Sequence, residues 1–313
     1  MTLRRIRDLI IVLASLLLPQ GAAAAAIKHV IVIVMENTDA REIYGNFEKA
    51  PYINSALMPV AARSLNFTDP LPKQAHSEPH YVWMEAGTRS FAGYTFSTDN
   101  DPTAANSTGS TQHLVRQMID TAGTANVGWM SYQQAMNAAT GACPVASKYP
   151  YAAKHNPFVF FRDISGNPPG KNNALCAAHH RPYSSFAADL AANRIANYVF
   201  ITPDLCHDMH NRCSSPSRIT AGDSWLAAEL PRMIDWANAN SSVIFVVWDE
   251  GRNTGKLPFF AVGPGVRANF ASSVALDHGS IIKSVETIFG LPILPAVANR
   301  NMLADMFRPG SFP

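Results

Sequence analysis

Two uninterrupted apolar runs, His29 to Met35 and Val243 to Trp248, dominate the hydrophobic pattern of the chain. Both are rich in β-branched residues and show no polar alternation, which is typical of strands buried on both faces of a parallel sheet. Shorter apolar runs predict further strands at Val127 to Tyr132, Tyr198 to Ile201 and Leu257 to Val262.

Helical periodicity occupies most of the intervals between these runs. Apolar residues at helical spacing predict helices over residues 50–67, 114–123, 187–196, 224–238 and 280–289, with Pro231 expected to distort the fourth. Strands that alternate with helices favour an α/β fold whose mostly parallel sheet is covered by helices on both faces. No repeat or linker divides the chain, so a single domain over residues 27–313 is predicted.

Residues 137–173 do not follow this alternation and are rich in Pro, Gly and Asn. A structureless loop of that length is uncommon in a compact domain. The segment is therefore interpreted either as an insertion on the substrate side or as a stretch with elements that the pattern does not reveal.

The N-terminus has the composition of a secretory signal peptide over residues 1–26. Three arginines precede the apolar stretch Leu9 to Leu18, and an alanine run from Ala22 to Ala26 follows. The apolar part is shorter than the roughly 20 residues that span a bilayer, so no stable membrane anchor is expected. The predicted location is secreted or periplasmic.

Composition and charge serve mainly to exclude other classes of protein. The chain is 47% hydrophobic and 15% charged, which indicates a globular protein with a large core. Without the predicted signal, which holds three Arg and Asp8, Lys and Arg fall from 25 to 22 and Asp and Glu from 23 to 22, so the formal charge is zero. No basic cluster indicates nucleic-acid binding.

Four cysteines remain after the signal, an even number that favours two disulfides in an oxidising compartment. Cys206 and Cys213 are the favoured local pair, which leaves Cys143 with Cys176, although four cysteines permit three pairings. A metal site is the weaker interpretation because no C-x-x-C pair occurs.

Ser77 is the candidate nucleophile. Pro79 suits the first turn of a helix, the apolar residues from Tyr81 continue it, and Gly87 offers a C-terminal stop. Ser77 is then at or next to the N-cap, where free N–H groups and the helix dipole hold an anionic phosphoryl or sulfuryl group. A simple capping serine is the alternative.

Oxygen-bearing side chains follow both long strands: Glu36 and Asn37 after the first, Asp249 and Glu250 after the second. The carboxyl ends of strands are where ligands gather in open α/β sheets. One divalent cation per chain, of undetermined identity, would keep several carboxylates ionised at one place. Alternatively, each acid caps the helix after its strand.

Five motifs together resemble the bacterial phosphoesterase family of secreted acid phosphatases and phospholipases C. They are Met35-Glu36-Asn37, His76-Ser77-Glu78-Pro79-His80-Tyr81, Asp208-Met209-His210, Trp248-Asp249-Glu250 and Asp277-His278-Gly279-Ser280 before Val285 to Leu291. The resemblance spans residues 28 to 292. It implies a branch of the alkaline phosphatase superfamily, an α/β sandwich with a Ser or Thr nucleophile and metal ligands at strand ends.

The resemblance also implies roles for single residues. Ser77 corresponds to the nucleophile, and Glu36, Asn37, Asp249 and Glu250 correspond to the metal ligands. Asp208 and His210 match an Asp-x-His motif beside the phosphate, His155 matches a Lys-His-x-Pro element, and His278 matches the histidine before the last helix; Asp208 and His278 are interpreted as substrate-binding. His76, His80 and His207 stay outside the predicted site, because a single loop histidine is typically exposed.

The predicted function is an acid phosphatase acting on small phosphomonoesters or phospholipid headgroups through a phosphoserine. His210, and after it His155, is expected to protonate the leaving alcohol. A phospholipase C acting on a phosphodiester is the runner-up, although the short chain shows no lipid-binding extension. The alternative outside enzymology is an exported phosphate- or metal-binding module on an inactivated scaffold.

Overall fold

An eight-stranded sheet forms the centre of the protein, for which a computed structural model describes residues 26–71, 75–136, 141–253 and 255–313. The predicted signal peptide falls almost entirely outside these ranges. The strand order is β10-β2-β9-β8-β1-β7-β5-β6. The strands are β1 (His29–Met35), β2 (Ala62–Ser64), β5 (Trp129–Gln133), β6 (His180–Pro182), β7 (Tyr198–Thr202), β8 (Ser242–Trp248), β9 (Phe259–Val262) and β10 (Phe270–Ser272).

The two predicted long strands are neighbours at the centre of the sheet. β1 pairs in parallel with β8, in a register that sets Met35 opposite Trp248, and in parallel with β7 on its other side. β9 runs antiparallel to both β8 and β2, so the sheet is mostly rather than wholly parallel. A separate small hairpin joins β3 (Ser90–Phe91) to β4 (Tyr94–Thr95).

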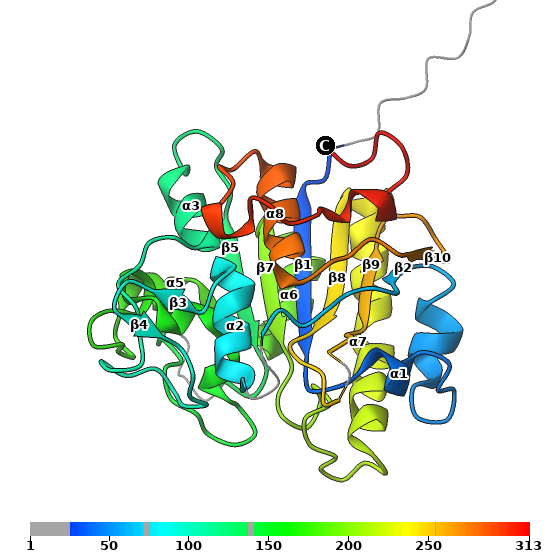
Figure 1. Ribbon diagram of the computed structural model, residues 1–313, viewed down its shortest axis with the longest axis horizontal. Coiled ribbons are helices and arrows are strands. Elements are labelled where there is room, and N and C mark those ends of the chain that lie inside the picture. Colours follow the sequence, from blue (N-terminus) through cyan, green and yellow to red (C-terminus); the bar gives the residue numbers. More distant parts are fainter. Residues whose placement is uncertain (1–25, 72–74, 137–140, 254) are drawn as a thin grey trace, which may run out of the picture.

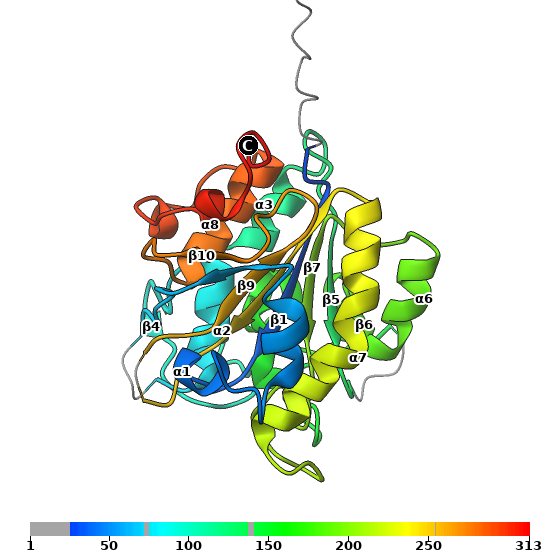
Figure 2. The ribbon, with the colours of Figure 1, turned by 90° about the vertical axis from the view of Figure 1, so that its right-hand side faces the viewer.

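Successive side chains of β1 point to opposite faces of the sheet and into two separate cores. Val30, Val32 and Val34 pack with residues of α2 (Ser77–Ala86), α3 (Leu114–Asp120) and α8 (His278–Phe289). Ile31, Ile33 and Met35 pack with residues of α6 (Phe186–Ala191) and α7 (Arg218–Ala239). Figures 1 and 2 show these helices on the two faces, which explains why the strand reads as a continuous apolar run.

The helix predictions are correct where a single helix occupies the predicted range. They are wrong where a short helix is followed by a strand within that range. α7 begins six residues before the predicted start and continues through Pro231. Residues 50–67, predicted as one helix, contain the π-helix η1 (Ile53–Leu57) and then strand β2. Local periodicity could not indicate β2, because that strand is stabilised by pairing with β9 and β10.

The segment predicted as a long loop contains several short elements within its described part. These are η2 (Ala153–His155), η3 (Pro157–Phe160) and α4 (Arg162–Ser165), followed by α5 (Ala174–Ala178). Phe158, Phe160 and Phe161 are buried in the core beneath α2. Of the two interpretations, that of hidden elements is confirmed. The remaining short elements are α1 (Ala40–Ile43), η4 (Tyr183–Ser185), η5 (Pro295–Val297) and η6 (Leu303–Met306).

Both predicted disulfides form, joining Cys143 to Cys176 and Cys206 to Cys213. The Cys143–Cys176 bridge is buried in the core, whereas Cys213 is exposed. Disulfides of this kind persist in oxidising compartments outside the cytoplasm. Within the ranges that the structure describes, no helix combines the length and the apolar character needed to cross a bilayer.

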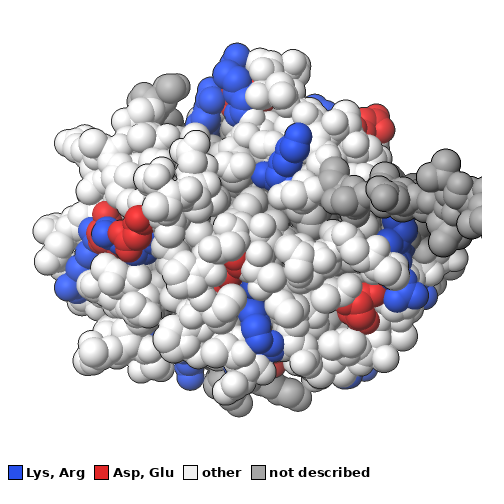
Figure 3. Space-filling model, turned by 90° about the horizontal axis from the view of Figure 1, so that it is seen from above, with Lys and Arg blue, Asp and Glu red and all other residues white. Residues whose placement is uncertain are grey.

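The amino and carboxyl ends of the strands form different surfaces. Figure 3 looks down on the face at the amino end of β1, where the visible Lys and Arg residues lie in small separate groups among mostly uncharged residues. The functional candidates lie at the other end, where β1 and β8 finish in Met35 and Trp248.

Gly87 ends α2 in the left-handed conformation, with φ +66°, and a Cβ there would lie 2.4 Å from Val297 Cγ1. We expect Gly87→Ala to lower the free energy of unfolding by about 2–4 kcal/mol, since backbone strain and a steric clash both oppose it. Gly93→Ala is the matched control, because Gly93 also has positive φ but nothing lies within 4 Å of the added carbon. Urea denaturation showing equal losses for the two variants would contradict the proposed clash.

Candidate functional site

The oxygen-bearing residues after β1 and β8 meet at one edge of the sheet, as the sequence predicts. The Asn37 N–H donates to Asp249 Oδ1 over 2.9 Å, and the Asp249 N–H donates to the Met35 carbonyl. Asn37 has φ +36°, a left-handed backbone that Asn tolerates. Its amide nitrogen donates to Glu36 Oε2 over 3.1 Å and to Glu250 Oε1 over 3.2 Å. The four predicted metal ligands therefore form one hydrogen-bonded group.

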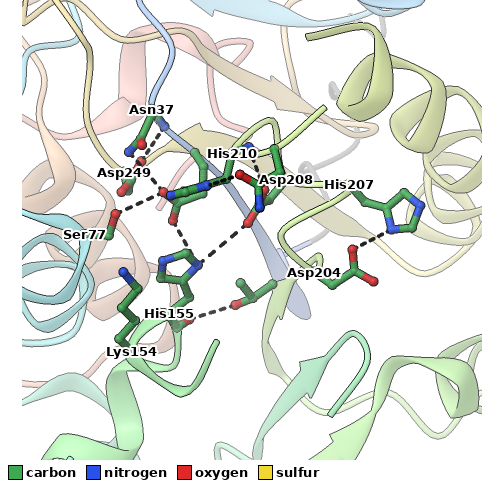
Figure 4. A network of polar contacts seen from close by, with 12 residues as sticks. Asn37, Ser77, Lys154, His155, Asp204, His207, Asp208, His210 and Asp249 are labelled. Atoms are coloured by element: carbon green, nitrogen blue, oxygen red, sulfur yellow. Dashed lines mark hydrogen bonds and ion pairs between the residues drawn. The ribbon is translucent and has the colours of Figure 1, made fainter. Parts of the chain in front are cut away.

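Ser77 reaches this group from the first residue of α2. His76 is the N-cap in extended conformation, so Ser77 lies next to the cap, one of the two predicted positions. The buried Ser77 hydroxyl donates to Glu36 Oε2 over 3.1 Å and lies 3.4 Å from Glu250 Oε1 (Figure 4). Its hydrogen bond to an acid of the β1 end goes beyond what a simple capping serine would show.

Tyr81 and His155 surround the other oxygen of Glu36. The Tyr81 hydroxyl, one helical turn after Ser77, donates to Glu36 Oε1 over 2.8 Å. His155 Nδ1 lies 3.3 Å from the same oxygen and 3.7 Å from Asp208 Oδ2, and its ring stacks on Tyr81 with centroids 5.0 Å apart. The sequence interpretation used Tyr81 only as a motif residue, although its i, i+4 spacing from Ser77 could have shown that both share a helix face.

Asp208 and His210 lie on a short segment closed by the Cys206–Cys213 disulfide. Asp208 is wholly buried and accepts a hydrogen bond from the His210 N–H over 2.7 Å. The His210 ring is partly exposed; its Nδ1 lies 3.0 Å from Asn211 Oδ1, and its centroid is 6.1 Å from that of His155. Both residues thus lie next to His155 (Figure 4).

His278 is buried at the first residue of α8, behind the end of β8. Its Nε2–H donates to the Trp248 carbonyl over 2.9 Å, and burial lowers the pKa of its imidazole. The preceding Asp277 forms a capping box with Ser280, which fixes the start of the helix. In this position His278 supports the residue before Asp249, and its predicted contact with substrate stays a prediction.

His80, which the sequence interpretation left out as an exposed loop histidine, is buried within α2. Its Nδ1 faces the His76 carbonyl at 2.7 Å and its Nε2 faces Asp69 Oδ1 at 2.9 Å. Both partners are acceptors, so both nitrogens carry hydrogen. Burial alone lowers the pKa of His80, but the bond to Asp69, with the charges of Asp69, Asp249 and Glu250, raises it to about 9.

The acids of the site are crowded and excluded from water. Burial raises the pKa of Glu36 well above its usual value, and the charges of Asp249 and Asp208 raise it further. Burial likewise raises the pKa values of Asp208 and Asp249, and with Asp249 it raises the pKa of Glu250 to about 8. Without an added positive charge, these carboxyl groups resist simultaneous ionisation.

The donor set fits a divalent cation. Asp208 Oδ2 and Asp249 Oδ2 are buried oxygens that accept no hydrogen bond from the described residues. Glu36, His155 and Asp208 each offer a ligand atom within 4.8 Å of the others. This group shares only Glu36 with the predicted ligand set. Carboxylate oxygen and imidazole nitrogen suit several divalent ions, so the donors do not select one.

Residues 67–292 match the sequence model of the Phosphoesterase family. The chain belongs to the phosphoesterase family. It is therefore a phosphoric ester hydrolase, and the resemblance predicted from the motifs is confirmed.

Relatives of this phosphoesterase carry phosphatase names. It is 28% identical over 292 residues to a phosphatidylinositol-3-phosphatase of Mycobacterium tuberculosis, covering 92% of this chain and 86% of that protein. It is 25% identical over 280 residues to a phosphate-repressible acid phosphatase of Penicillium chrysogenum, covering 86% of this chain but only 60% of the fungal protein.

Solved structures confirm the predicted fold. A phosphonate monoester hydrolase from Silicibacter pomeroyi superposes with a TM-score of 0.53 at 10% identity, covering 89% of this chain and 76% of that chain. Murine ectonucleotide pyrophosphatase/phosphodiesterase 5 gives 0.53 at 12% identity, covering 90% and 100%. At such identities the likeness shows the fold alone, here the predicted α/β fold with a mostly parallel sheet.

The His80–Asp69 pair gives a pH-dependent stability. The folded pKa of about 9 exceeds the unfolded value near 6.5, so the stabilisation is complete below about pH 6.5 and is lost as pH rises through 9. Urea denaturation of wild type and His80→Gln should therefore show a stability difference that shrinks between pH 6 and pH 10. Asp69→Asn should remove most of that dependence. A difference independent of pH would exclude a charged His80.

Proposed function

We propose that this phosphoesterase is an exported acid phosphatase that hydrolyses phosphomonoesters through a phosphoserine at Ser77, with one divalent metal ion in the site. The observation that supports the proposal most directly is the position of the Ser77 hydroxyl. It lies at the N-terminus of α2 and donates to Glu36, inside a group of buried acids from three separate segments. Serine, acids and histidine are the parts that covalent phosphoryl transfer requires.

Ser77 would act as the nucleophile with Glu36 as the acceptor of its proton. The hydroxyl hydrogen already points to Glu36 Oε2, while Tyr81 occupies Oε1 and fixes the carboxylate plane. The Ser77 oxygen forms a bond to phosphorus in line with the leaving oxygen, and free N–H groups in the first turn of α2 face the phosphoryl oxygens. Glu36 returns the proton when the phosphoserine is hydrolysed.

Asp249 and Glu250 would hold the metal ion, with Asn37 as a further ligand and with Glu36 as a ligand in its ionised state, before and after it carries the Ser77 proton. The Asn37 amide would turn over for this, because its nitrogen now faces Glu36 and Glu250. When bound, the ion supplies charge stabilisation for the phosphoryl group and lowers the pKa of an oxygen nucleophile. His80 lies behind this group as a second positive charge, bound to Asp69.

The proton for the leaving alcohol would come from His210. Burial lowers the pKa of His155 well below its usual value, and Lys154 and His210 lower it further, so His155 is neutral and suited to act as a ligand or base. His210 is partly exposed, and hydrogen bonding of its Nδ1–H to Asn211 leaves Nε2 for the substrate. After the alcohol leaves, neutral His210 accepts a proton from the water that attacks the phosphoserine.

The relatives' names support a monoester substrate. One is named a phosphatidylinositol-3-phosphatase and the other a phosphate-repressible acid phosphatase, and phosphatase is the name of an enzyme that hydrolyses phosphomonoesters. The two disulfides support an exported protein. Turnover of p-nitrophenyl phosphate with none of a choline phosphodiester is the expected preference, and the reverse would favour a phospholipase C.

Ser77→Ala separates an enzyme from a binding module. We expect turnover of p-nitrophenyl phosphate to fall by at least about a thousandfold while orthovanadate still binds, because the N–H groups of α2 and the proposed metal ligands stay in place. Acid-quenched wild type should carry phosphate on the peptide that contains Ser77. Thr88→Ala, just beyond the other end of α2, is the control and should keep full activity. Near-normal turnover by Ser77→Ala would disprove the mechanism.

Asp249→Asn tests the metal. An amide cannot replace a charged ligand, so both activity and bound metal should fall, activity by at least about a hundredfold. Asp189→Asn is the control, since Asp189 is equally buried but binds Tyr132 and two arginines on the other face. Elemental analysis of the purified protein and titration with a chelator provide the measurements. Full activity in exhaustively chelated, metal-free protein would refute the metal-assisted proposal.

A further inference from the structure

Arg218 is the first residue of α7, on the opposite face of the sheet from Ser77, yet its side chain extends to the ends of the strands. Ser217 caps the helix by accepting the Thr220 N–H, so the position of Arg218 is fixed by the start of a 22-residue helix. The side chain is only 15% exposed, which makes it one of the less accessible cations of the protein. The charge of Arg218 pairs with Glu42 over 2.8 Å rather than with the acids of the site.

On one side, the Arg218 guanidinium holds the loop that follows β1. Its Nη1 donates to the Asn37 carbonyl over 3.0 Å and to Thr38 Oγ1 over 2.6 Å. The Thr38 hydroxyl in turn donates to the Glu36 carbonyl over 2.8 Å. The backbone of two predicted metal ligands, Glu36 and Asn37, is thus held directly or through one hydroxyl.

The second anchor of this loop lies at α1. Arg218 Nη2 donates to Glu42 Oε1, and Glu42 Oε2 accepts the Asp39 N–H as part of the capping box. The guanidinium therefore bonds directly to the start of the short stretch that connects β1 to α1, and through Glu42 it holds Asp39 at the end of that stretch. A planar group with donors in several directions can do this, whereas an ammonium group acts as a compact point charge.

On its other side, Arg218 holds the segment that carries Asp208 and His210. Its Nη1 lies 3.3 Å from the carbonyl of Met209, the residue between them, which has φ +79°. For a residue with a side chain this left-handed backbone is strained and needs support. One turn along α7, a Cβ on Gly222 would lie 2.3 Å from Met209 Cγ, so the helix packs directly beneath the same residue.

We propose that Arg218 is a positioning residue for phosphoester hydrolysis, whose guanidinium holds the Glu36–Asn37 loop and the Asp208–His210 segment in place on both sides of the hydrogen bond from the Glu36 N–H to the Asp208 carbonyl. This inference rests on the proposed function, because it takes those four residues as the site. Arg218 touches neither the Ser77 hydroxyl nor a carboxylate of the site in the described residues; it acts through three backbone carbonyls, one of them reached through Thr38. Without these hydrogen bonds, the residues proposed to bind the metal ion and to donate the proton would be displaced relative to Ser77.

The test compares Arg218→Ala and Arg218→Lys with Arg232→Ala. Arg232 is an arginine of the same helix whose partner is Glu229, and it has no bond to the strand ends. Each variant is assayed for kcat and KM with p-nitrophenyl phosphate, for its melting temperature, and for recovery of turnover on addition of millimolar guanidinium chloride.

Arg218→Ala should lower kcat by about 10- to 100-fold, the range known for residues that orient metal ligands, with a smaller change in KM. Guanidinium should restore part of the lost kcat by occupying the space of the removed group, and Arg218→Lys should recover less than half of it. Arg232→Ala should match wild type and gain nothing from guanidinium. Such rescue is specific, because millimolar guanidinium is too dilute to change the folding stability of a merely destabilised variant and would not restore its turnover.

A kcat of Arg218→Ala within about threefold of wild type would overturn the proposal, and so would a loss that follows the fall in melting temperature without rescue. The outcome of the Arg218 test does not depend on whether the reaction passes through a phosphoserine. If Ser77→Ala kept its turnover, the proposed mechanism would fail, but rescue of Arg218→Ala would still report whether the guanidinium positions whatever groups perform the hydrolysis.

Discussion

The site depends on bringing like charges together where water is excluded. Glu36, Asp208 and Asp249 are wholly buried and Glu250 lies beside them, so each carboxylate raises the cost of ionising its neighbours. The acids lie close together because the register of β1 and β8 places Met35 opposite Trp248. This register fixes the backbone positions of the acidic residues that follow each strand. The surrounding donors, Ser77, Tyr81 and the Asn37 amide, are arranged as compensation for that negative charge.

Two helices impose this arrangement from opposite faces of the sheet. α2 carries Ser77, His80 and Tyr81 within its first two turns, so that the proposed nucleophile, the buried imidazole and the hydroxyl that binds Glu36 are positioned by one helix. α7 supports the same strand ends from the other side through Arg218 and through the close packing that Gly222 permits. Because both helices also carry large parts of the two cores, the geometry of the site is tied to the stability of the whole domain.

The sequence predicted those parts of the structure that are coded locally. The apolar runs of β1 and β8, the acids directly after them and Ser77 beside a helix start could be located because each signal lies within a few consecutive residues. Short strands such as β2 were missed because pairing with distant strands stabilises them. The contacts of Asp69 and Arg218 could not be predicted from neighbouring residues. Asp69 bonds to His80, 11 residues away, and Arg218 bonds to Thr38, about 180 residues away. His80 was wrongly set aside as an exposed loop histidine, although it lies inside the predicted helix and is buried against Asp69.

The direction of β9 has a consequence for the way this scaffold can vary. Because β9 is antiparallel to β8, the chain leaves β8 at Asp249 and re-enters the sheet at Phe259 on the same edge, with no helix crossing to the far side. A parallel neighbour would have required a crossover of a dozen or more residues packed on the sheet. The connection after Glu250 instead passes beside the site, where Arg252 donates to the Asn37 carbonyl, and insertions in it would not disturb the sheet. The length of this connection can therefore change without moving the acids at the end of β8, because pairing with β1 and β9 holds that strand in place.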